Sequence, residues 1–258
     1  CVSPAETFST QWLQLILPLG SKLKDRSTRA SCLQVISRLL WTYLYRCNND
    51  TQRDTYRKLE QIVHLILPPG KKTHTTDPSI VDPLIEIIRI IGFKHEDFCF
   101  RTIIFPLINS ELFAHGKDVH SVRVDQLEPE KMVIGIRAFL AIMVDLEKGE
   151  EGRPPFPKEY RSNLQSERLP VSPIMATPKP RSRPVTPTPG AERLSHPVAM
   201  STLNDVSRSY YKRFCEILGK ITIICDETFG GQAVLDEKFA PPVPKTPIAE
   251  TFNFSRRD

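Results

Sequence analysis

The sequence predicts an all-α fold, a fragment of a helical-repeat protein with a long disordered proline-rich insertion. Apolar residues recur with the period of an α-helix in nearly every segment that is rich in them. Proline or glycine marks the short turns between those segments, and no segment requires a strand. The chain has 258 residues and is 40% hydrophobic, which is enough for at least one core.

The chain is expected to be part of a longer protein. It starts at Cys1 instead of methionine, and residues 8–19 already resemble the inside of a packed helix with no charged leader. No apolar run reaches the roughly 20 residues that span a bilayer, so membrane insertion is not expected. No signal peptide is visible either.

Five or six helices are expected in the first half of the chain. Helix 98–108 is expected to continue through Pro106. The expected helices cover 8–19, 29–46, 54–67, a stretch from Asp82 to near Gly92, 98–108 and 127–146. The clearest of them, 127–146, carries its apolar face at Met132, Ile136, Phe139, Leu140 and Met143.

Proline positions predict where several of these helices begin and end. Pro68 and the residues after it should stop helix 54–67, because proline cannot continue the hydrogen-bond ladder. Asp82 is expected to cap a helix whose first residue is Pro83, where a missing N–H does no harm. Glu128 and Pro129 open helix 127–146 in the same manner.

A short sequence echo points to stacked helix pairs. Leu-Pro-Leu-Gly at 17–20 recurs as Leu-Pro-Pro-Gly at 67–70, a spacing near the roughly 40 to 47 residues of HEAT or armadillo units. A chance recurrence of a helix stop would explain the echo equally well. The predicted class is a HEAT/armadillo-like α-solenoid whose first helical block covers 1–148.

The rest of the chain divides into three parts. Residues 149–200 contain 11 of the 23 prolines and are expected to be a disordered Pro/Ser/Thr-rich linker. Residues 201–231 should return to helix, with Thr202 as the cap and Asp205 three positions later. Its expected buried face is Tyr210, Phe214, Ile217, Ile221 and Ile224. Residues 232–258 read as an extended, proline-containing tail.

Patterns for catalysis, cofactors and metals are nearly absent. No glycine-rich phosphate loop, no G-x-S-x-G elbow and no kinase signature is found, so no cofactor and no catalytic residue is predicted. His115 and His120 could bind a metal only on a generous interpretation, and solvated loop histidines are the preferred one. His64 is interpreted as a packed or capping residue, and His95 as part of a solvated helix start.

Charge and cysteine content exclude further classes. The net charge of +5 comes from basic residues scattered over every segment, which argues against a nucleic-acid partner. The six cysteines lie far apart and form neither a disulfide framework nor a zinc motif, as expected in a reducing cytosol.

The linker and the tail carry candidate phosphoacceptors. Phosphorylation would add about −1.5 to −2 charges to a linker with eight Lys and Arg against five acids, and could reverse its sign. Ser201 is a further candidate because His196 lies five residues before it, the position at which NDR-group kinases prefer histidine. The residues that precede a proline are Ser172, Thr177, Thr186, Thr188 and Thr246.

Several blocks together resemble the N-terminal region of the Furry family of cell-morphogenesis proteins. The blocks are SRLLWTYLYR at 37–46, residues 84–91 with 103–105, EPEKM at 128–132 running into GIRAFL at 135–140, and GEEGRPP at 149–155. Shorter likenesses to fungal members follow at 223–226 and 245–247. An ordered series of this length is more specific than any single motif.

The resemblance implies a helical-repeat scaffold within a very large protein of polarised growth. It implies NDR/LATS-type kinases and their Mob co-activators as partners, and a place in the cytoplasm at the cell cortex. No catalytic residues are carried over, and Trp41 and Arg137 are interpreted as buried fold markers. Two alternatives stay open: a HEAT-type adaptor for vesicle traffic or microtubules, and an accessory domain of a larger enzyme.

Overall fold

The computed structural model describes residues 4–47, 49–68, 77–114, 116–157, 202–231, 234, 236 and 237. All of its regular elements are helical, so within these ranges the all-α prediction is confirmed. The main elements are α1 (Ala5–Ile16), α2 (Leu19–Lys22), α3 (Arg26–Arg46), α4 (Gln52–Ile66), α5 (Pro78–Lys94), α6 (Glu96–Cys99), a π-helical turn (Phe100–Ile104), α7 (Phe105–Leu107), α8 (Pro129–Glu147) and α10 (Asp205–Phe229). Short 3-10 turns lie at Ser110–Phe113, Val119–Ser121, Val124–Gln126 and Gly149–Gly152.

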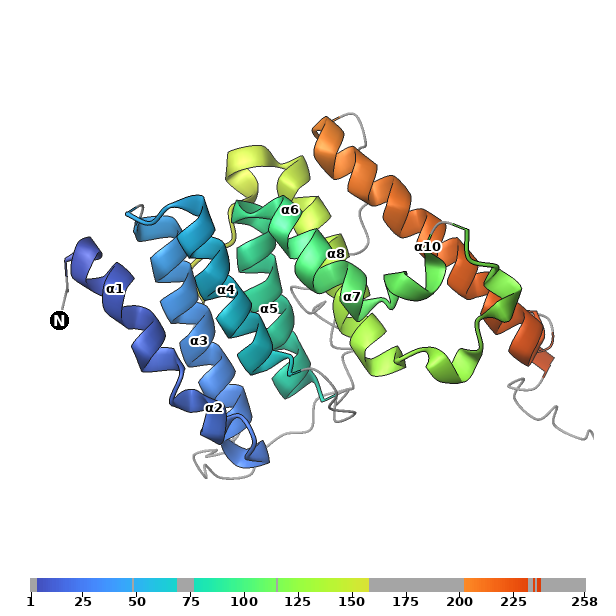
Figure 1. Cartoon of the computed structure of the whole chain (residues 1–258), viewed down its shortest axis with the longest axis horizontal. Helices are drawn as coiled ribbons and strands as arrows, with labels where there is room; N and C mark the ends of the chain where they lie inside the picture. The colour runs from blue at the N-terminus through green and yellow to red at the C-terminus, as the bar shows by residue number, and fades with distance from the viewer. Residues whose placement is uncertain are drawn as a thin grey trace, which may run out of the picture.

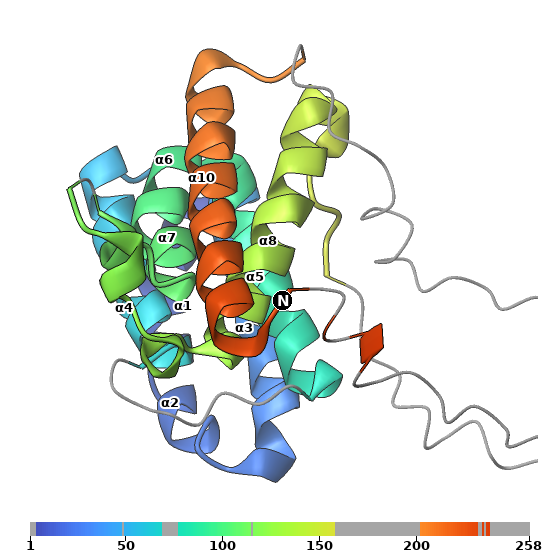
Figure 2. The same cartoon turned by 90° about the vertical axis from the view of Figure 1, so that its right-hand side faces the viewer.

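The helices form a row of two layers. Figure 1 shows α1, α3, α4 and α5 side by side, followed by α6, α7 and α8. Seen along the row, α4, α6 and α7 lie in one layer, and α3, α5 and α8 lie in the other (Figure 2). Helix α1 packs against α3 at the start of the row. In the second layer α5 packs against both α3 and α8. Helix pairs stacked in two layers are the arrangement of an α-solenoid, while the HEAT or armadillo type stays a prediction.

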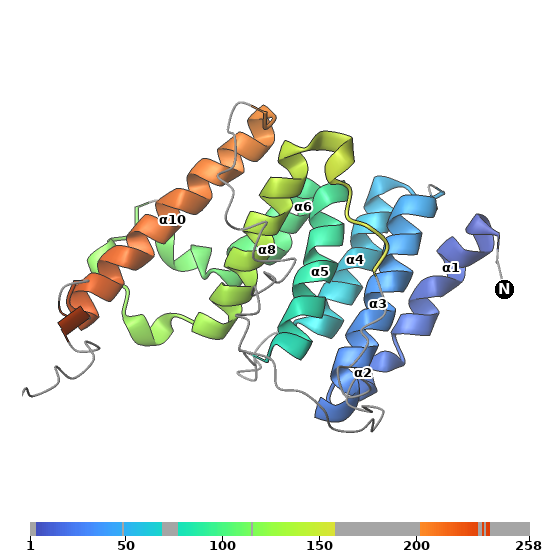
Figure 3. The same cartoon turned by 180° about the vertical axis from the view of Figure 1, so that it is seen from behind.

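Helix α10 lies across the far end of this row (Figures 1 and 3). Phe214 of α10 stacks on Phe139 of α8 with ring centroids 3.8 Å apart, and Tyr210 lies 4.9 Å from Phe100 of the π-helical turn. One helix therefore covers apolar side chains from both layers. All five residues predicted for its inner face, Tyr210, Phe214, Ile217, Ile221 and Ile224, are buried.

Helix α5 begins five residues before the predicted start. Its cap is Asp77, whose side chain accepts a hydrogen bond from the Ser79 backbone N–H at 3.0 Å, and Pro78 takes the first helical position. The same Asp-Pro chemistry recurs at 82–83, so the prediction that Asp82 caps the helix is wrong. The earlier start buries Ile80 and Val81, which outweighs the backbone hydrogen bond that Pro83 cannot donate.

The predicted helix 98–108 is divided by a π-helical turn. The Phe105 N–H bonds to the carbonyl of Phe100 five residues earlier, just before Pro106. Pro106 has no N–H to donate to the regular ladder, and the wider turn just before it leads into α7.

Two further expectations need correction. The cap of α10 is Asn204, whose side chain accepts from the Ser207 N–H at 2.7 Å, so Thr202 is not the cap. Arg137 is not buried: its side chain is 41% exposed and pairs with Asp82 at 2.9 Å. Trp41 is only partly buried.

On helix α8, three of the five residues predicted for the apolar face are buried and the other two are partly buried against the core. The buried residues are Met132, Phe139 and Met143, and the partly buried ones are Ile136 and Leu140.

The chain after α8 turns back along the second layer. Gly149 adopts a left-handed φ of +57° after the helix, and the 3-10 turn Gly149–Gly152 follows. Residues 153–157, named the strap below, then run from the end of α8 past α5 to α3 (Figure 3). These residues were assigned to the linker from their proline content, whereas the structure packs them on the helices. The linker positions 158–200 lie outside the described residues.

Gly152 is expected to tolerate no side chain. A methyl group built at this position would lie 1.9 Å from the backbone oxygen of Asp145, so the chain would have to move away. We expect Gly152→Ala to lower the free energy of unfolding by about 1–3 kcal/mol, as overpacked sites do. Chemical denaturation followed by circular dichroism measures this change.

Gly219→Ala is the matched control. Gly219 lies in α10, and a methyl group there would have no heavy atom within 4 Å. The substitution should therefore raise stability by about 0.4–1 kcal/mol, since alanine is favoured over glycine in a helix. Equal effects of the two substitutions would contradict the close approach at Gly152.

Candidate protein-binding surfaces

The described residues contain no group of three or more His, Cys, Asp or Glu side chains that could hold a metal ion. His120 pairs with Glu227 of α10 at 2.6 Å, and its predicted companion His115 lies outside the described residues. His64 is exposed, and its Nδ1 lies 2.8 Å from the backbone oxygen of Glu60. These two histidines serve local structure.

All predicted phosphoacceptors lie outside the described residues. They are Ser172, Thr177, Thr186, Thr188, Ser201 and Thr246. Within the described ranges, no helix combines the length and apolar character needed to cross a membrane.

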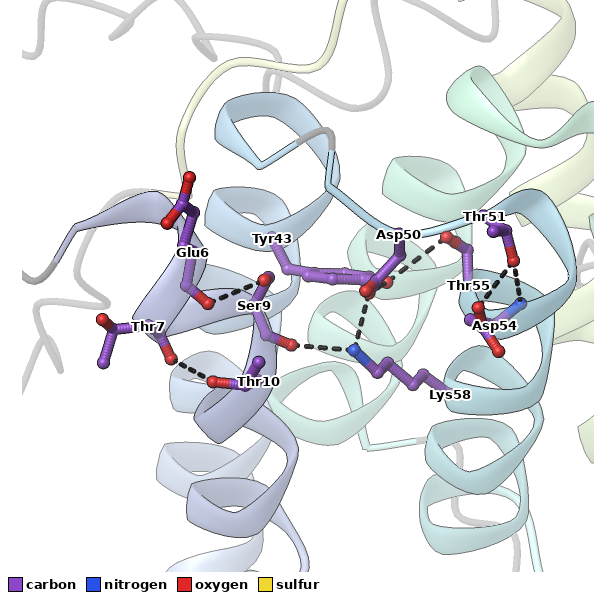
Figure 4. A network of polar contacts seen from close by, with 10 residues as sticks. All are labelled: Glu6, Thr7, Ser9, Thr10, Tyr43, Asp50, Thr51, Asp54, Thr55 and Lys58. Atoms are coloured by element: carbon purple, nitrogen blue, oxygen red, sulfur yellow. Dashed lines mark hydrogen bonds and ion pairs between the residues drawn. The ribbon is translucent and has the colours of Figure 1, made fainter.

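A network of polar side chains joins α1, α3 and α4 (Figure 4). The Tyr43 hydroxyl donates to Asp50 and lies 3.3 Å from the Thr55 hydroxyl oxygen. Lys58 donates to the Asp50 carboxylate at 2.6 Å and to the Ser9 backbone oxygen at 2.8 Å. Burial alone would raise the pKa of Asp50, but hydrogen bonds from Lys58 and Tyr43 outweigh it and lower that pKa. The carboxylate therefore stays charged and joins Tyr43 of α3 to Lys58 of α4, and Lys58 extends the network to α1.

A cavity of about 310 Å³ lies beside this network. The thiol of Cys47 lines this cavity, and burial raises the pKa of that thiol, so it stays protonated at neutral pH. Burial also holds the pKa of His95, which lines the same cavity, down to about 4. His95 is thus neutral and packs edge-on against Tyr56 with ring centroids 5.4 Å apart, instead of forming the solvated helix start predicted for it. Cys47 and His95 are therefore both uncharged at neutral pH.

A larger groove of about 770 Å³ lies between α6–α7 and the first turns of α10, and is named the α10 groove. Arg101 donates from Nε to the Tyr210 hydroxyl at 2.8 Å and pairs with Asp97 at 2.9 Å. The Arg213 guanidinium lies 4.3 Å from the ring centroid of Phe105. The lining residues are Asp97, Arg101, Phe105, Pro106, Ser110, Glu111, Asp205, Val206, Ser209, Tyr210 and Arg213.

The α10 groove offers the chemistry of a protein-binding surface. The side chain of Arg101 is 69% exposed, so its remaining donors are open to a partner. Val206 is 52% exposed and adds an apolar contact at the start of α10. Arginine and aromatic residues around an open hollow are typical of binding hot spots. Sequence reasoning missed this site, since its two sides lie about a hundred residues apart and neither carries a motif.

Replacing His95 by a residue that does not titrate should make the free energy of unfolding depend less on pH in the acid range. The unfolded chain protonates His95 below about pH 6.5, whereas the folded chain resists protonation down to about pH 4. Stability from this residue is therefore complete above pH 6.5 and is lost as the pH falls toward 4. His95→Phe keeps a ring against Tyr56 and should make the midpoint of urea unfolding less pH-dependent across that interval.

Gly219→Ala provides the control for this measurement, because it removes no titrating group. It should retain the slope of the parent chain between pH 6.5 and 4. A slope unchanged in His95→Phe would contradict the burial of a neutral imidazole.

Comparison with known proteins assigns the chain to a family. The family model described as "Cell morphogenesis N-terminal" matches residues 1–258. The chain is 32% identical over 174 residues to the cell morphogenesis protein PAG1 of Saccharomyces cerevisiae, a match of 64% of this chain and 7% of that protein. It is 23% identical over 149 residues to the cell polarity protein mor2 of Schizosaccharomyces pombe, covering 57% of this chain and 6% of that protein.

No solved structure matches the chain. The matched region is a small part of each relative's length. The resemblance found in blocks 37–46, 128–140 and 149–155 is thus confirmed by a match over the whole sequence. The chain belongs to the cell morphogenesis N-terminal family, the family of the Furry-type morphogenesis proteins.

Proposed function

We propose that the chain is a non-catalytic scaffold segment in cell morphogenesis and polarised growth, which organises an NDR/LATS-type kinase together with its Mob co-activator. The family supports the role in morphogenesis. The α10 groove supports a protein partner, because it places two arginines and two aromatic rings around one open hollow. A scaffold acts by raising the local concentration of its partners, which requires binding surfaces and no reacting groups.

The α10 groove is proposed as the contact for the kinase or the Mob protein. Its exposed donors come from Arg101 and Arg213, which suits a partner segment with carboxylate side chains. Asp205 and Glu111 also line the groove and would repel a segment bound in a register that brings its carboxylates next to them. We propose the cytoplasm at the cell cortex as the scaffold's site of action.

Phosphorylation is proposed to tune this scaffold. The candidate acceptors Ser172, Thr177, Thr186, Thr188 and Ser201 lie before α10 in the chain, and Thr246 lies after it. Added negative charge next to α10 would compete for the same arginines that the partner needs.

Arg213→Ala should weaken capture of the kinase–Mob pair. The natural full-length protein carrying the substitution would be purified from its own cells, and retained proteins would be quantified by mass spectrometry. An arginine at the centre of an interface contributes about 2 kcal/mol or more, so recovery should fall at least about tenfold. Thermal unfolding of the 258-residue chain would be measured in parallel, because Arg213 also contacts Phe105.

Lys212→Ala is the matched control, with the same loss of charge one position away. Lys212 is exposed and does not line the α10 groove. An equal loss of kinase and Mob recovery in the two variants would show that the α10 groove is not the contact. Recovery of coat proteins or tubulin without any kinase would overturn the kinase scaffold and favour an adaptor.

A further inference from the structure

The strap is held on α3 by contacts that involve its backbone. The Trp41 Nε1–H donates to the carbonyl oxygen of Pro154 at 2.9 Å. One turn earlier on α3, the Arg38 Nε–H donates to the carbonyl oxygen of Pro157 at 3.1 Å. Phe156 lies edge-on to Trp41 at 5.2 Å, and the Arg38 guanidinium lies 5.4 Å from the centre of the Phe156 ring.

The sequence of the strap, Arg-Pro-Pro-Phe-Pro, favours an extended chain. Arg153, Pro154 and Phe156 each precede a proline, and the helical region is disfavoured for a residue before proline. Proline itself fixes φ near −65°, the value of polyproline II. That helix has three residues per turn, so positions 154 and 157 fall on the same side. Burial agrees: Pro154 and Pro157 are buried, and Pro155 and Phe156 are exposed.

The face of α3 that receives the strap has a matching period. Arg38, Trp41 and Tyr45 lie three and four residues apart, which places them on one side of the helix. Tyr45 donates its hydroxyl to the Ile90 carbonyl at 3.1 Å, which fixes its ring, and Arg153 lies 5.8 Å from the centre of that ring. This face of α3 therefore presents two hydrogen-bond donors, on Arg38 and Trp41, next to the rings of Trp41 and Tyr45. Backbone carbonyls in polyproline II have no internal hydrogen-bond partner and can accept from these donors.

We propose that this face of α3 is a binding site for proline-rich peptides of the P-x-x-P type, and that the strap is its ligand in cis. Recognition of polyproline II by aromatic grooves uses the same elements: rings under the prolines, and donors to the backbone carbonyls. The preferred ligand carries two prolines three positions apart with an aromatic residue before the second. In an intact chain the strap occupies the site, and a proline-rich partner segment takes its place.

Competition with the strap sets the strength that such a partner needs. A short tether gives a ligand an effective concentration of about 1 mM. A free peptide with the same intrinsic affinity, present at about 10 μM, would therefore occupy only on the order of one site in a hundred. A weak ligand therefore cannot displace the strap. A partner must bind more tightly than the strap does, through contacts in addition to those of the P-x-x-P segment.

The test uses the 258-residue chain and a synthetic peptide with blocked ends that reproduces residues 150–157. A strap variant carrying Pro154→Ala, Phe156→Ala and Pro157→Ala should expose the site. We expect it to bind the peptide saturably and at least tenfold more tightly than the parent chain does, with a shift of the Trp41 indole N–H resonance. The same peptide with its prolines replaced by alanine should bind at least tenfold more weakly. Equal binding of the two peptides, or no shift at Trp41, would overturn the proposal.

Two further measurements protect the test against loss of folding. Trp41→Phe in the strap variant keeps a ring and removes the donor, so it should reduce peptide affinity while the circular dichroism spectrum is unchanged. If the strap variant does not fold, the parent chain is titrated with about 10 mM peptide, which competes with the tethered strap. The backbone amide resonance of Phe156 in the chain should then move, because the strap leaves α3, and the indole resonance of the buried Trp12 should not. A static Phe156 resonance at that concentration would also overturn the proposal.

Discussion

The ion pair between Arg89 and Asp145 is the contact on which the second layer depends. Arg89 of α5 donates from Nε and Nη2 to the Asp145 carboxylate of α8, with Nη2 at 2.9 Å, and both side chains are almost fully buried. Arg89 also pairs with Glu86 of its own helix at 3.2 Å, so removing Asp145 would leave the guanidinium one carboxylate in place of two, at a cost of up to roughly 3–5 kcal/mol. A shift of one residue along α8 would turn the carboxylate about 100° away. The pair therefore fixes how α8 lies on α5, and with it the position from which Gly149–Gly152 leaves the helix.

Much of the fold could be predicted from helical periodicity. The spacing of the apolar residues predicted the inner faces of α8 and α10. A helix buries its apolar side whichever element it packs against, so this prediction does not require knowledge of the neighbour. Helix starts were harder. Both Asp77-Pro78 and Asp82-Pro83 are good caps locally, and only the burial of Ile80 decides between them. Tertiary packing, which a single sequence does not display, made that choice.

The candidate surfaces were beyond sequence reasoning for a different reason. The α10 groove joins Arg101 to Arg213, and the strap joins Trp41 to Pro154, so each site exists only after distant segments meet. At the strap, the high proline content predicted a disordered linker, because such a composition is typical of disorder, whereas the strap packs on α3. What distinguishes 153–157 is the three-residue spacing of two prolines beside an aromatic residue. A docked polyproline segment produces this pattern, but it carries meaning only once a matching aromatic face is known.

The strap also has a mechanical consequence. In a solenoid each helix pair contacts only its neighbours, so the row bends easily by adding small rotations between successive pairs. Here a segment that follows α8 reaches back past α5 and bonds to α3, and so spans more than one junction of the row. Opening or twisting those junctions would stretch the strap and pull its carbonyls from Arg38 and Trp41. The helices from α3 to α8 should therefore respond to force as one stiff unit, and the compliance of the longer protein should lie outside them.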